Sequence, residues 1–366
     1  MKLELTPKSL DLEITNNCNL RCSYCSHFNS EGDTGIDLQT EEWLKFFKEL
    51  KDCNVMDVTL SGGEPLFRKD FKELVLGVIE NRMRFSILTN GILLDDDMAQ
   101  FIKSTKRCNS IQVSIDGPGP EIHDASRGTG SFSKALSGLQ TIMKYNLPST
   151  VRLTINKHNY TKLEEAAKLL LEDIGLSSFS TNSASHLGVC RTNKDDVQLT
   201  SEEYSEAIET LFMLVKKYNG RIAALAGPLA SGRHWVDMER AKNEGADKFP
   251  GCGFLTSCGG VFSKMAVQSD GSMVPCSQLP HIKLGKINQD NLKEVWLNHP
   301  ELKRLRERRD IPLGNFKFCS GCEYIPYCRG GCPALSYTLG GDENVPAPDQ
   351  CLRYFLNTGG KLPDTE

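Results

Sequence analysis

The chain has 366 residues, 39% of them hydrophobic and 25% charged, which is typical of a globular protein with one large core and an appended unit. It has 43 lysine and arginine residues against 47 aspartate and glutamate residues, and this balance gives no reason to expect nucleic acid or an anionic membrane as a partner. The sequence has neither a secretion signal nor an apolar run of about 18 residues, so we expect a cytoplasmic protein. Its fourteen cysteines therefore predict metal ligands rather than disulfides.

Short β-rich runs alternate with amphipathic helical runs in the first 220 residues. The predicted strands cover residues 10–15, 55–60, 85–89, 111–115, 151–155 and 178–182. Between them apolar residues recur with helical periodicity, as in the stripe of Trp43, Phe46 and Leu50. The last helix of this series has Thr200 and Glu203 at the spacing of a capping box.

Six β-then-α units predict an α/β fold, an open partial (β/α)6 barrel of parallel strands with right-handed crossovers. We expect this barrel in residues 1–220, a bridge in residues 221–251, and a cysteine-rich C-terminal domain in residues 252–366. Ligands of such folds bind at the carboxyl ends of the strands. The loops that follow each strand are therefore the first place to look for chemistry.

The loop after the first strand contains Cys18, Cys22 and Cys25, with the spacing C-x3-C-x2-C. Three thiolates can hold three irons of a [4Fe–4S] cluster and leave the fourth iron open to another molecule. A zinc site or ordinary loop cysteines are the alternatives. The triplet resembles the signature of the radical S-adenosylmethionine (radical SAM) superfamily. In that family the open iron binds the amino and carboxylate groups of S-adenosylmethionine.

The loop after the second strand contains Gly62, Gly63 and Glu64. Glycines allow the backbone to approach a ligand closely, and a carboxylate can hold an ammonium group. This loop resembles the family motif that binds the methionine amino group of the cofactor. The resemblance implies further cofactor contacts from Tyr24, Asn90, Ser114, Asp116, Arg127 and Ile155. An ion pair is the alternative role of Arg127, and core packing is the alternative role of Ile155.

Eight further cysteines follow in the C-terminal third, and their spacing resembles the SPASM extension of radical SAM enzymes. The alternative is a set of zinc knuckles. The resemblance implies that Cys252, Cys258, Cys276 and Cys332 hold a first auxiliary cluster. It implies that Cys319, Cys322, Cys328 and Cys351 hold a second. Together with the triplet, this predicts three [4Fe–4S] clusters.

Three cysteines remain outside these ligand sets: Cys53, Cys108 and Cys190. Cys190 lies in the loop after the sixth strand, on the edge where we expect the substrate. It is therefore a candidate hydrogen-atom donor, with an ordinary loop thiol as the alternative. The other two lie near a helix end and a strand start, where we expect no chemistry.

The resemblance implies reductive cleavage of S-adenosylmethionine to a 5′-deoxyadenosyl radical. This radical would abstract hydrogen from a peptide or protein side chain and lead to oxidation, cross-linking or epimerisation, as in the maturation of ribosomal peptides. The group that matures sulfatases anaerobically is similar in its cysteine spacing, but it has an aspartate base directly after the third auxiliary cysteine. Ser277 stands at this position here, so formylglycine formation is disfavoured.

Two other functions stay open: a radical SAM enzyme for a small molecule, and an electron-transfer protein without chemistry of its own. The enzyme would need a reductase such as flavodoxin or ferredoxin. Fewer than a dozen residues precede the first strand, so a peptide's leader would be held by a separate protein or by the barrel rim. The basic run Lys303, Arg304, Arg306, Arg308 and Arg309 is either a surface for such a partner or a solvated helix face.

Overall fold

The computed structural model describes residues 3–28, 35–256 and 258–363. In this part of the chain, ten strands form one sheet with the order β10-β9-β8-β1-β2-β3-β4-β5-β6-β7. The strands are β1 (Ser9–Thr15), β2 (Asp57–Gly62), β3 (Arg84–Thr89), β4 (Cys108–Ser114), β5 (Ser149–Ile155), β6 (Phe179–Ser183), β7 (Ile222–Ala224), β8 (Lys264–Val267), β9 (Ser272–Val274) and β10 (Gly285–Lys286). Adjacent strands from β8 to β7 are parallel, whereas β9 and β10 pair antiparallel at one edge.

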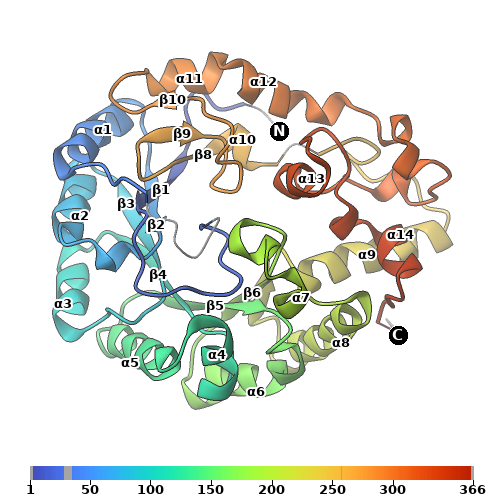
Figure 1. The fold of residues 1–366 in the computed structure, drawn as a ribbon, viewed down its shortest axis with the longest axis horizontal. Helices are drawn as coiled ribbons and strands as arrows, with labels where there is room; N and C mark the ends of the chain where they lie inside the picture. Colours follow the sequence, from blue (N-terminus) through green and yellow to red (C-terminus); the bar gives the residue numbers. More distant parts are fainter. Residues whose placement is uncertain (1–2, 29–34, 257, 364–366) are drawn as a thin grey trace.

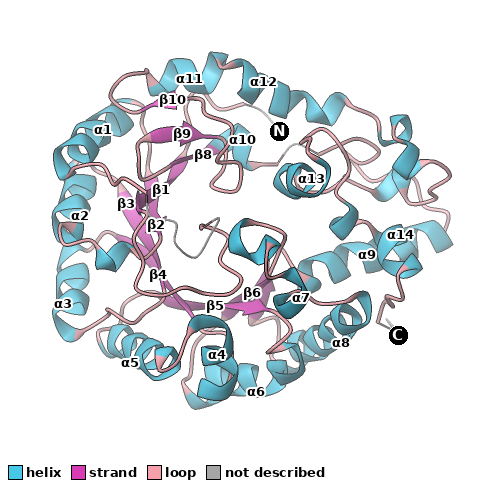
Figure 2. Cartoon of the chain, viewed as in Figure 1, coloured by secondary structure: helices cyan, strands magenta, loops and turns pink. Residues whose placement is uncertain are grey.

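The sheet curves into an arc with helices on its outer side, as Figures 1 and 2 show. The helices of the barrel are α1 (Thr40–Asp52), α2 (Phe71–Glu80), α3 (Asp96–Thr105), α4 (Pro120–Arg127), α5 (Ser131–Lys144), α6 (Leu163–Lys168), α7 (Lys194–Val197) and α8 (Ser201–Lys217). Those that follow are α9 (Pro228–Asn243), α10 (Gly260–Ser263), α11 (Leu292–Asn298), α12 (Pro300–Glu307), α13 (Pro333–Gly340) and α14 (Leu352–Asn357). The C-terminal helices lie along the side of the ring that the strands leave open.

The predicted partial barrel is confirmed, and each of the six predicted strands is present with ends shifted by a few residues. The capping box is also confirmed. The Thr200 side chain accepts a hydrogen bond from the Glu203 backbone nitrogen, and the Glu203 side chain accepts one from the Thr200 backbone nitrogen. Two more parallel strands, β7 and β8, extend the sheet. Both are short, so their few apolar residues gave no clear strand pattern, and β7 lies within the segment predicted as a bridge.

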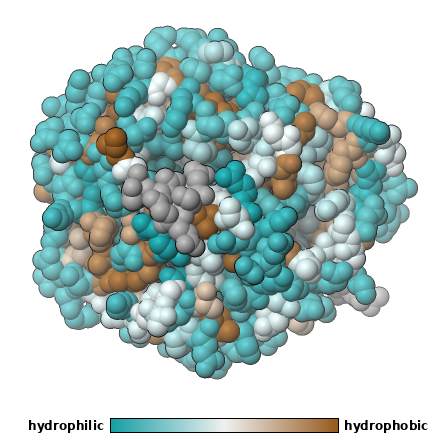
Figure 3. All heavy atoms as spheres, viewed as in Figure 1, coloured by the Kyte–Doolittle hydropathy of each residue, from teal (hydrophilic) through white to brown (hydrophobic). Residues whose placement is uncertain are grey.

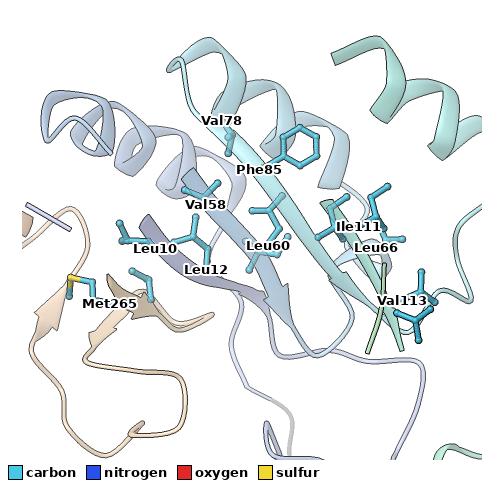
Figure 4. Packing of buried hydrophobic residues seen from close by; sticks show 14 of the residues in the cluster. Leu10, Leu12, Val58, Leu60, Leu66, Val78, Phe85, Ile111, Val113 and Met265 are labelled. Atoms are coloured by element: carbon cyan, nitrogen blue, oxygen red, sulfur yellow. The ribbon is translucent and has the colours of Figure 1, made fainter. Parts of the chain in front are cut away.

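Strand β1 lies between β2 and β8, in the interior of the sheet. Leu10, Leu12 and Ile14 alternate along it and are fully buried against the helices. Leu12 is in register with Leu60 on one side and with Val267 on the other. Figure 4 shows this packing between the strands and the neighbouring helices. The C-terminal segment is thus tied to the first strand by backbone pairing as well as by side chains.

The surface is largely hydrophilic, with apolar side chains scattered between charged ones, as Figure 3 shows for one face. Within the described residues, no helix is both long and apolar enough to cross a membrane.

Replacing Leu12 by alanine tests the role of β1. Because Leu12 is fully buried between two paired strands, we expect the free energy of unfolding to fall by about 2–5 kcal/mol. Denaturant titration of the cluster-loaded protein measures this loss. The matched control is Leu5→Ala, at a side chain that is 74% exposed, where the change should be close to zero. Equal effects of the two substitutions would contradict this account.

Candidate active site

The cysteine loop begins where β1 ends, and the carboxylate of Asp37 fixes this point. Asp37 accepts hydrogen bonds from Thr15 Oγ1 at 2.5 Å, from the Asn16 backbone at 2.7 Å and from Asn17 Nδ2 at 3.0 Å. Within the loop, the Cys25 backbone nitrogen donates to the carbonyl of Cys22 at 3.1 Å. These bonds hold the three cysteines at the carboxyl end of β1.

The loop after β2 packs directly on the cysteine loop. The Gly63 nitrogen donates to the carbonyl of Thr15, and the Glu64 nitrogen donates to that of Asn17, both at 2.9 Å. A Cβ atom at position 63 would lie 2.3 Å from the Asn17 oxygen and 3.1 Å from Cys18 Cβ. Glycine is therefore required here, because only a residue without a side chain lets the two loops approach this closely.

Glu64 is a buried carboxylate held by the ends of two neighbouring strands. It accepts hydrogen bonds from the Leu66 nitrogen at 3.1 Å, from Thr89 Oγ1 at 2.7 Å and from the Asn90 nitrogen at 2.8 Å. Burial nevertheless raises the pKa of Glu64 to about 7. A bound ammonium group would favour its ionised form. Asn90 also donates to Asn19 of the cysteine loop at 2.7 Å.

A second buried network surrounds Asp116, which is 1% exposed. Its carboxylate accepts hydrogen bonds from Arg127 Nε at 2.6 Å, from the Tyr24 hydroxyl, and from the Thr154 nitrogen at 2.8 Å. The Asp116 nitrogen donates to Nδ1 of His123, whose pKa burial lowers to about 4, so this imidazole is neutral and can accept the bond. Asp116 thus orients Tyr24 and Arg127, and its own contact with the cofactor stays a prediction.

Arg127 connects this network to the cysteine loop. Its guanidinium lies 5.5 Å from the centre of the Tyr24 ring, and its Nη1 is 3.9 Å from the sulfur of Cys22. Arg127 therefore forms the ion pair that was named as the alternative to a cofactor contact. The same side chain also faces the predicted cluster. Both features follow from the single carboxylate of Asp116.

The thiols of the cysteine loop influence one another electrostatically. Burial raises the pKa of Cys18 to about 11 and that of Cys22 to about 12, and the neighbouring thiols of the loop add to both shifts. Thiols in such surroundings lose their protons when a metal is bound and compensates their charge. The donor set, its mutual proximity and the N–H donors aimed at sulfur fit an iron–sulfur cluster.

The predicted ligands of the first auxiliary cluster come together in part. Burial raises the pKa of Cys276 to about 12, and Cys258 and Cys332 raise it further through their charge. Cys252 is fully buried on the adjoining turn, where the Gly253 nitrogen donates to the carbonyl of Cys328 at 2.9 Å. The membership of Cys252 in this set therefore stays a prediction.

The predicted ligands of the second auxiliary cluster line one small apolar pocket. Cys319, Cys322, Cys328 and Cys351 all lie on its wall, together with apolar residues such as Leu313 and Ala347. Burial raises the pKa of Cys328 to about 12, and the charges of the other three thiols add to this shift. The arrangement fits a closed, four-thiolate cluster. Among the described residues, no three His, Cys, Asp or Glu side chains converge as a site for a single metal ion.

A cavity of about 610 Å³ lies between the cysteine loop and the first auxiliary set. Ser26 and His27 line it from the cysteine loop, and Ser277 and Gln278 line it directly after Cys276. The loop after β6 contributes Leu187, Gly188 and Arg191, and further wall residues are Glu13, Asp270, His281, Lys283 and Tyr337. Its lining is mostly polar and contains charges of both signs. A molecule in this cavity would have the cysteine loop on one side and Cys276 on the other.

Two histidines in the cavity wall each pair with a carboxylate. Nδ1 of His27 is 3.6 Å from Glu13, and its buried Nε2 has no hydrogen-bond partner among the described residues. Nε2 of His281 is 2.6 Å from Glu343, and the imidazole stacks on Tyr337 with ring centres 3.6 Å apart. In each pair the carboxylate fixes the orientation of the imidazole at the edge of the cavity.

The remaining predicted residues lie in different surroundings. Ser114 ends β4, opposite Arg152 of β5. Ile155 ends β5 and is fully buried in the hydrophobic core, as its alternative role required.

Cys190 is fully buried against Tyr24 and Val197, and Gln198 donates a hydrogen bond to its sulfur at 3.5 Å. Burial raises the pKa of Cys190 to about 11. In this arrangement its thiol does not line the cavity, so its role as a hydrogen donor stays a prediction.

The basic run after residue 302 does not form the surface that its sequence predicted. Arg306 and Arg308 are buried, and Arg306 Nε donates to the carbonyl of Val261 at 2.8 Å. Arg304 pairs with Glu301 and with Glu343. Both earlier interpretations, a partner surface and a solvated helix face, are therefore wrong for Arg306 and Arg308. Their charges point into the C-terminal region because α12 packs against α10.

Comparison with known proteins agrees with this geometry. The model of the radical SAM superfamily matches residues 12–170, and that of an iron-sulfur cluster-binding domain (SPASM) matches residues 258–323. The chain belongs to the radical SAM superfamily. It is a radical SAM enzyme with a SPASM region, and the cofactors expected for this family are [4Fe–4S] clusters and S-adenosylmethionine.

Its relatives act on different kinds of molecule. The chain is 28% identical to the AdoMet-dependent heme synthase of Methanosarcina barkeri, over 92% of this chain and 94% of that protein. It is 25% identical to the PqqA peptide cyclase of Granulibacter bethesdensis, over 93% of this chain and 86% of that protein. Family membership thus establishes the radical chemistry of this enzyme and leaves its substrate open.

Two solved structures show the same fold. Streptococcus suis SuiB bound to the precursor peptide SuiA has a TM-score of 0.72 and 16% identity, covering 95% of this chain and 76% of that one. The protein anSMEcpe with bound AdoMet has a TM-score of 0.69 and 20% identity, covering 96% of both chains. At these identities the likeness establishes the arrangement of the barrel and its C-terminal extension.

Sequence reasoning missed His281 and Arg191 as cavity residues, and Glu343 as the partner of His281. They come from three separate segments, and none lies in a motif with a recognisable spacing. The sequence offered one signal of the cavity, which is the polar residue Glu13 near the end of the strand before the cysteine loop. A polar residue with strand periodicity on the inner face of β1 must point into the barrel.

Substitution of Asp116 by asparagine tests the buried network. The change leaves Arg127 buried opposite a neutral group, so we expect the free energy of unfolding to fall by about 3–5 kcal/mol and binding of S-adenosylmethionine to weaken. Denaturant titration and equilibrium dialysis measure the two effects.

The matched control for Asp116 is Asp57→Asn, which breaks a partly exposed ion pair with Arg84 at 2.9 Å. This substitution should cost at most about 1 kcal/mol. If Asp116→Asn also lowered the free energy of unfolding by at most about 1 kcal/mol, the buried ion pair would stabilise the protein no more than an exposed one.

Proposed function

We propose that this enzyme modifies a peptide or protein side chain after reductive cleavage of S-adenosylmethionine, and that three [4Fe–4S] clusters take part. The open iron of the first cluster would supply the electron that generates the 5′-deoxyadenosyl radical. Hydrogen abstraction by this radical is the first step on the substrate, and oxidation, cross-linking or epimerisation are the possible outcomes. We place the partial barrel in residues 1–220, the bridge in residues 221–251 and the SPASM domain in residues 252–366.

In this proposal the residues of the two buried networks hold the cofactor. Cys18, Cys22 and Cys25 bind the cluster, and Gly62 and Gly63 let the backbone approach the bound molecule. Glu64 would accept the cofactor's ammonium group, and Arg127, oriented by Asp116, would pair with its carboxylate. Tyr24, Asn90, Ser114 and Ile155 are proposed to contact the ribose and adenine region.

The observation that supports the peptide assignment is a pair of cavities that share Leu187 in their walls. Beside the first cavity lies a second of about 380 Å³, and Leu187 lines both. Tyr204, Trp235 and Phe355 form an aromatic wall of the second cavity, with the rings of Trp235 and Phe355 4.6 Å apart. An extended chain could place its reacting residue in the polar first cavity and an apolar neighbour in the second.

A small-molecule substrate is the second candidate function. It is favoured by the 28% identity to a heme synthase over nearly the full length of both proteins. The first cavity has an adequate volume for such a ligand, since small-molecule sites span about 300–1,000 Å³. Its polar walls suit a substrate with several carboxylates, which Arg191, Lys283 and His281 could bind. They are less suited to a flat apolar ring.

Replacement of Cys18, Cys22 and Cys25 together by alanine tests the cluster assignment. If three four-iron clusters are present, we expect the bound iron to fall by about one third and cleavage of S-adenosylmethionine to cease. Iron analysis and chromatographic detection of 5′-deoxyadenosine measure these effects. The control is Cys53→Ala, at a thiol outside all three sets, which should retain both iron and activity. Cleavage retained in the triple variant would contradict the proposed mechanism.

Release of 5′-deoxyadenosine by the anaerobic, reduced protein tests the substrate class. Peptides encoded beside the gene form one arm of the experiment, scrambled peptides of equal composition form its control, and porphyrin precursors of heme form the second arm. We expect a peptide to stimulate release and to undergo a change in mass or in the configuration of one residue.

Each other outcome leads to a different conclusion. Stimulation by a porphyrin alone would overturn the peptide assignment and establish the small-molecule function. Slow cleavage that no compound stimulates would contradict both substrates tested while retaining the enzyme class. A protein with intact clusters and no cleavage at all would support an electron-transfer protein.

A further inference from the structure

Arg308 is the most deeply buried positive charge in the C-terminal region, with 0% of its surface exposed. It follows α12 and begins the short 3-10 turn Arg308–Asp310. Its Nε donates to the carbonyl of Thr256 at 3.5 Å, at the limit of a hydrogen bond. Its Nη1 and Nη2 have no hydrogen-bond partner among the described residues.

An unpaired buried guanidinium costs several kcal/mol, so native proteins pair such groups or neutralise them. Neutralisation does not occur here, because burial lowers the pKa of Arg308 only to about 10, and it stays charged at neutral pH. The carboxylate of Glu343 does not serve as its partner, since His281 and Arg304 already occupy both oxygens. The described protein groups therefore leave this charge without a counterion.

The surroundings of Arg308 show where the counterion belongs. The groups around it whose negative charge would favour the guanidinium are Cys332, once ionised, and the carboxylates of Asp342 and Glu343. Thr256, which accepts its one hydrogen bond, lies two residues before Cys258. Cys332 and Cys258 are both proposed ligands of the first auxiliary cluster. A [4Fe–4S] cluster held by four thiolates carries a net negative charge. This charge would balance the guanidinium of Arg308, which the described protein groups do not.

We infer that Arg308 is the buried counterion of the first auxiliary cluster and raises its reduction potential. This inference rests on the proposed cluster at Cys252, Cys258, Cys276 and Cys332. A fixed positive charge and N–H donors close to cluster sulfur stabilise the reduced state, which is more negative than the oxidised one. Arg308 is a positioning and tuning residue in this role, because it touches neither substrate nor S-adenosylmethionine.

The second auxiliary set also has a cation beside it, but one that is less buried than Arg308. Its neighbouring cation, Arg353, is only partly buried, and its guanidinium donates to the carbonyls of Ser320, at 2.8 Å, and of Phe318. Solvent screens this charge, and its donors are occupied by the backbone. The two auxiliary clusters should therefore differ in potential, with the first the easier to reduce and better suited to accept an electron from the substrate side.

The test is an EPR-monitored redox titration of the full cluster-loaded protein with Arg308→Gln, Arg308→Met and Arg308→Lys. The signal lost in Cys276→Ala identifies the first auxiliary cluster. With either neutral residue, the ratio of reduced to oxidised cluster at a fixed potential should fall at least tenfold, which is about 59 mV for a one-electron couple. Arg308→Lys should restore most of this loss, and Arg353→Gln should leave the first cluster unchanged.

Iron and sulfide content separates the possible failures. Unchanged potential in an assembled Arg308→Gln or Arg308→Met cluster would overturn the inference. The neutral variants lose the iron of this cluster in a second possible outcome. If Arg308→Lys then retains that iron, the result supports the inference. If Arg308→Lys loses as much iron, the result overturns the inference, because the side chain would then matter only for packing. A wild-type protein without a cluster at this set would overturn the cluster assignment, and the inference with it, while leaving the radical chemistry intact.

Discussion

The pairing of β1 with β2 on one side and β8 on the other is the constraint on which the rest of the structure depends. β1 leads into the cysteine loop, β2 leads into the loop of Gly63 and Glu64, and β8 leads through β9 toward Cys276. Because the three strands are parallel and in fixed register, their loops emerge at the same edge of the sheet. The cysteine loop and the loop of Gly63 and Glu64 therefore pack against each other, whereas Cys276 follows the antiparallel strand β9; Ser277 and Gln278 line the same cavity as Ser26 and His27.

Charge is the second organising element. Asp116, Arg127, Glu64 and Arg308 are all buried, and each lies near a set of cysteines. Such groups weaken a fold that has nothing to compensate them, so their presence is best understood through the bound cluster and cofactor. The buried charges thus fit the negatively charged clusters and the zwitterionic cofactor that the proposed function places beside them.

The cavity beside the cysteine loop has two histidine–carboxylate pairs at its edge. Ser277 stands after Cys276 and lines the cavity, where it cannot act as a base at neutral pH. Glu13 lies beside His27, and Glu343 pairs with His281, so a carboxylate holds each histidine of the cavity wall in place. The fold is shared with enzymes of several substrates, and function is set by these cavity residues.

The sequence by itself determined the barrel and the place of the Cys18–Cys25 and Gly63–Glu64 loops at the ends of β1 and β2, because periodicity and spacing are local properties that the chain carries wherever it folds. It also singled out Arg127, for which the ion-pair alternative is present in the structure and the contact with the cofactor stays a prediction. Only the tertiary structure decided that Asp116 orients Arg127, that Cys190 is buried, and that Arg306 and Arg308 point inward. Each of these depends on contacts between residues far apart in the chain, and no local pattern records which face of a short segment a distant helix will cover.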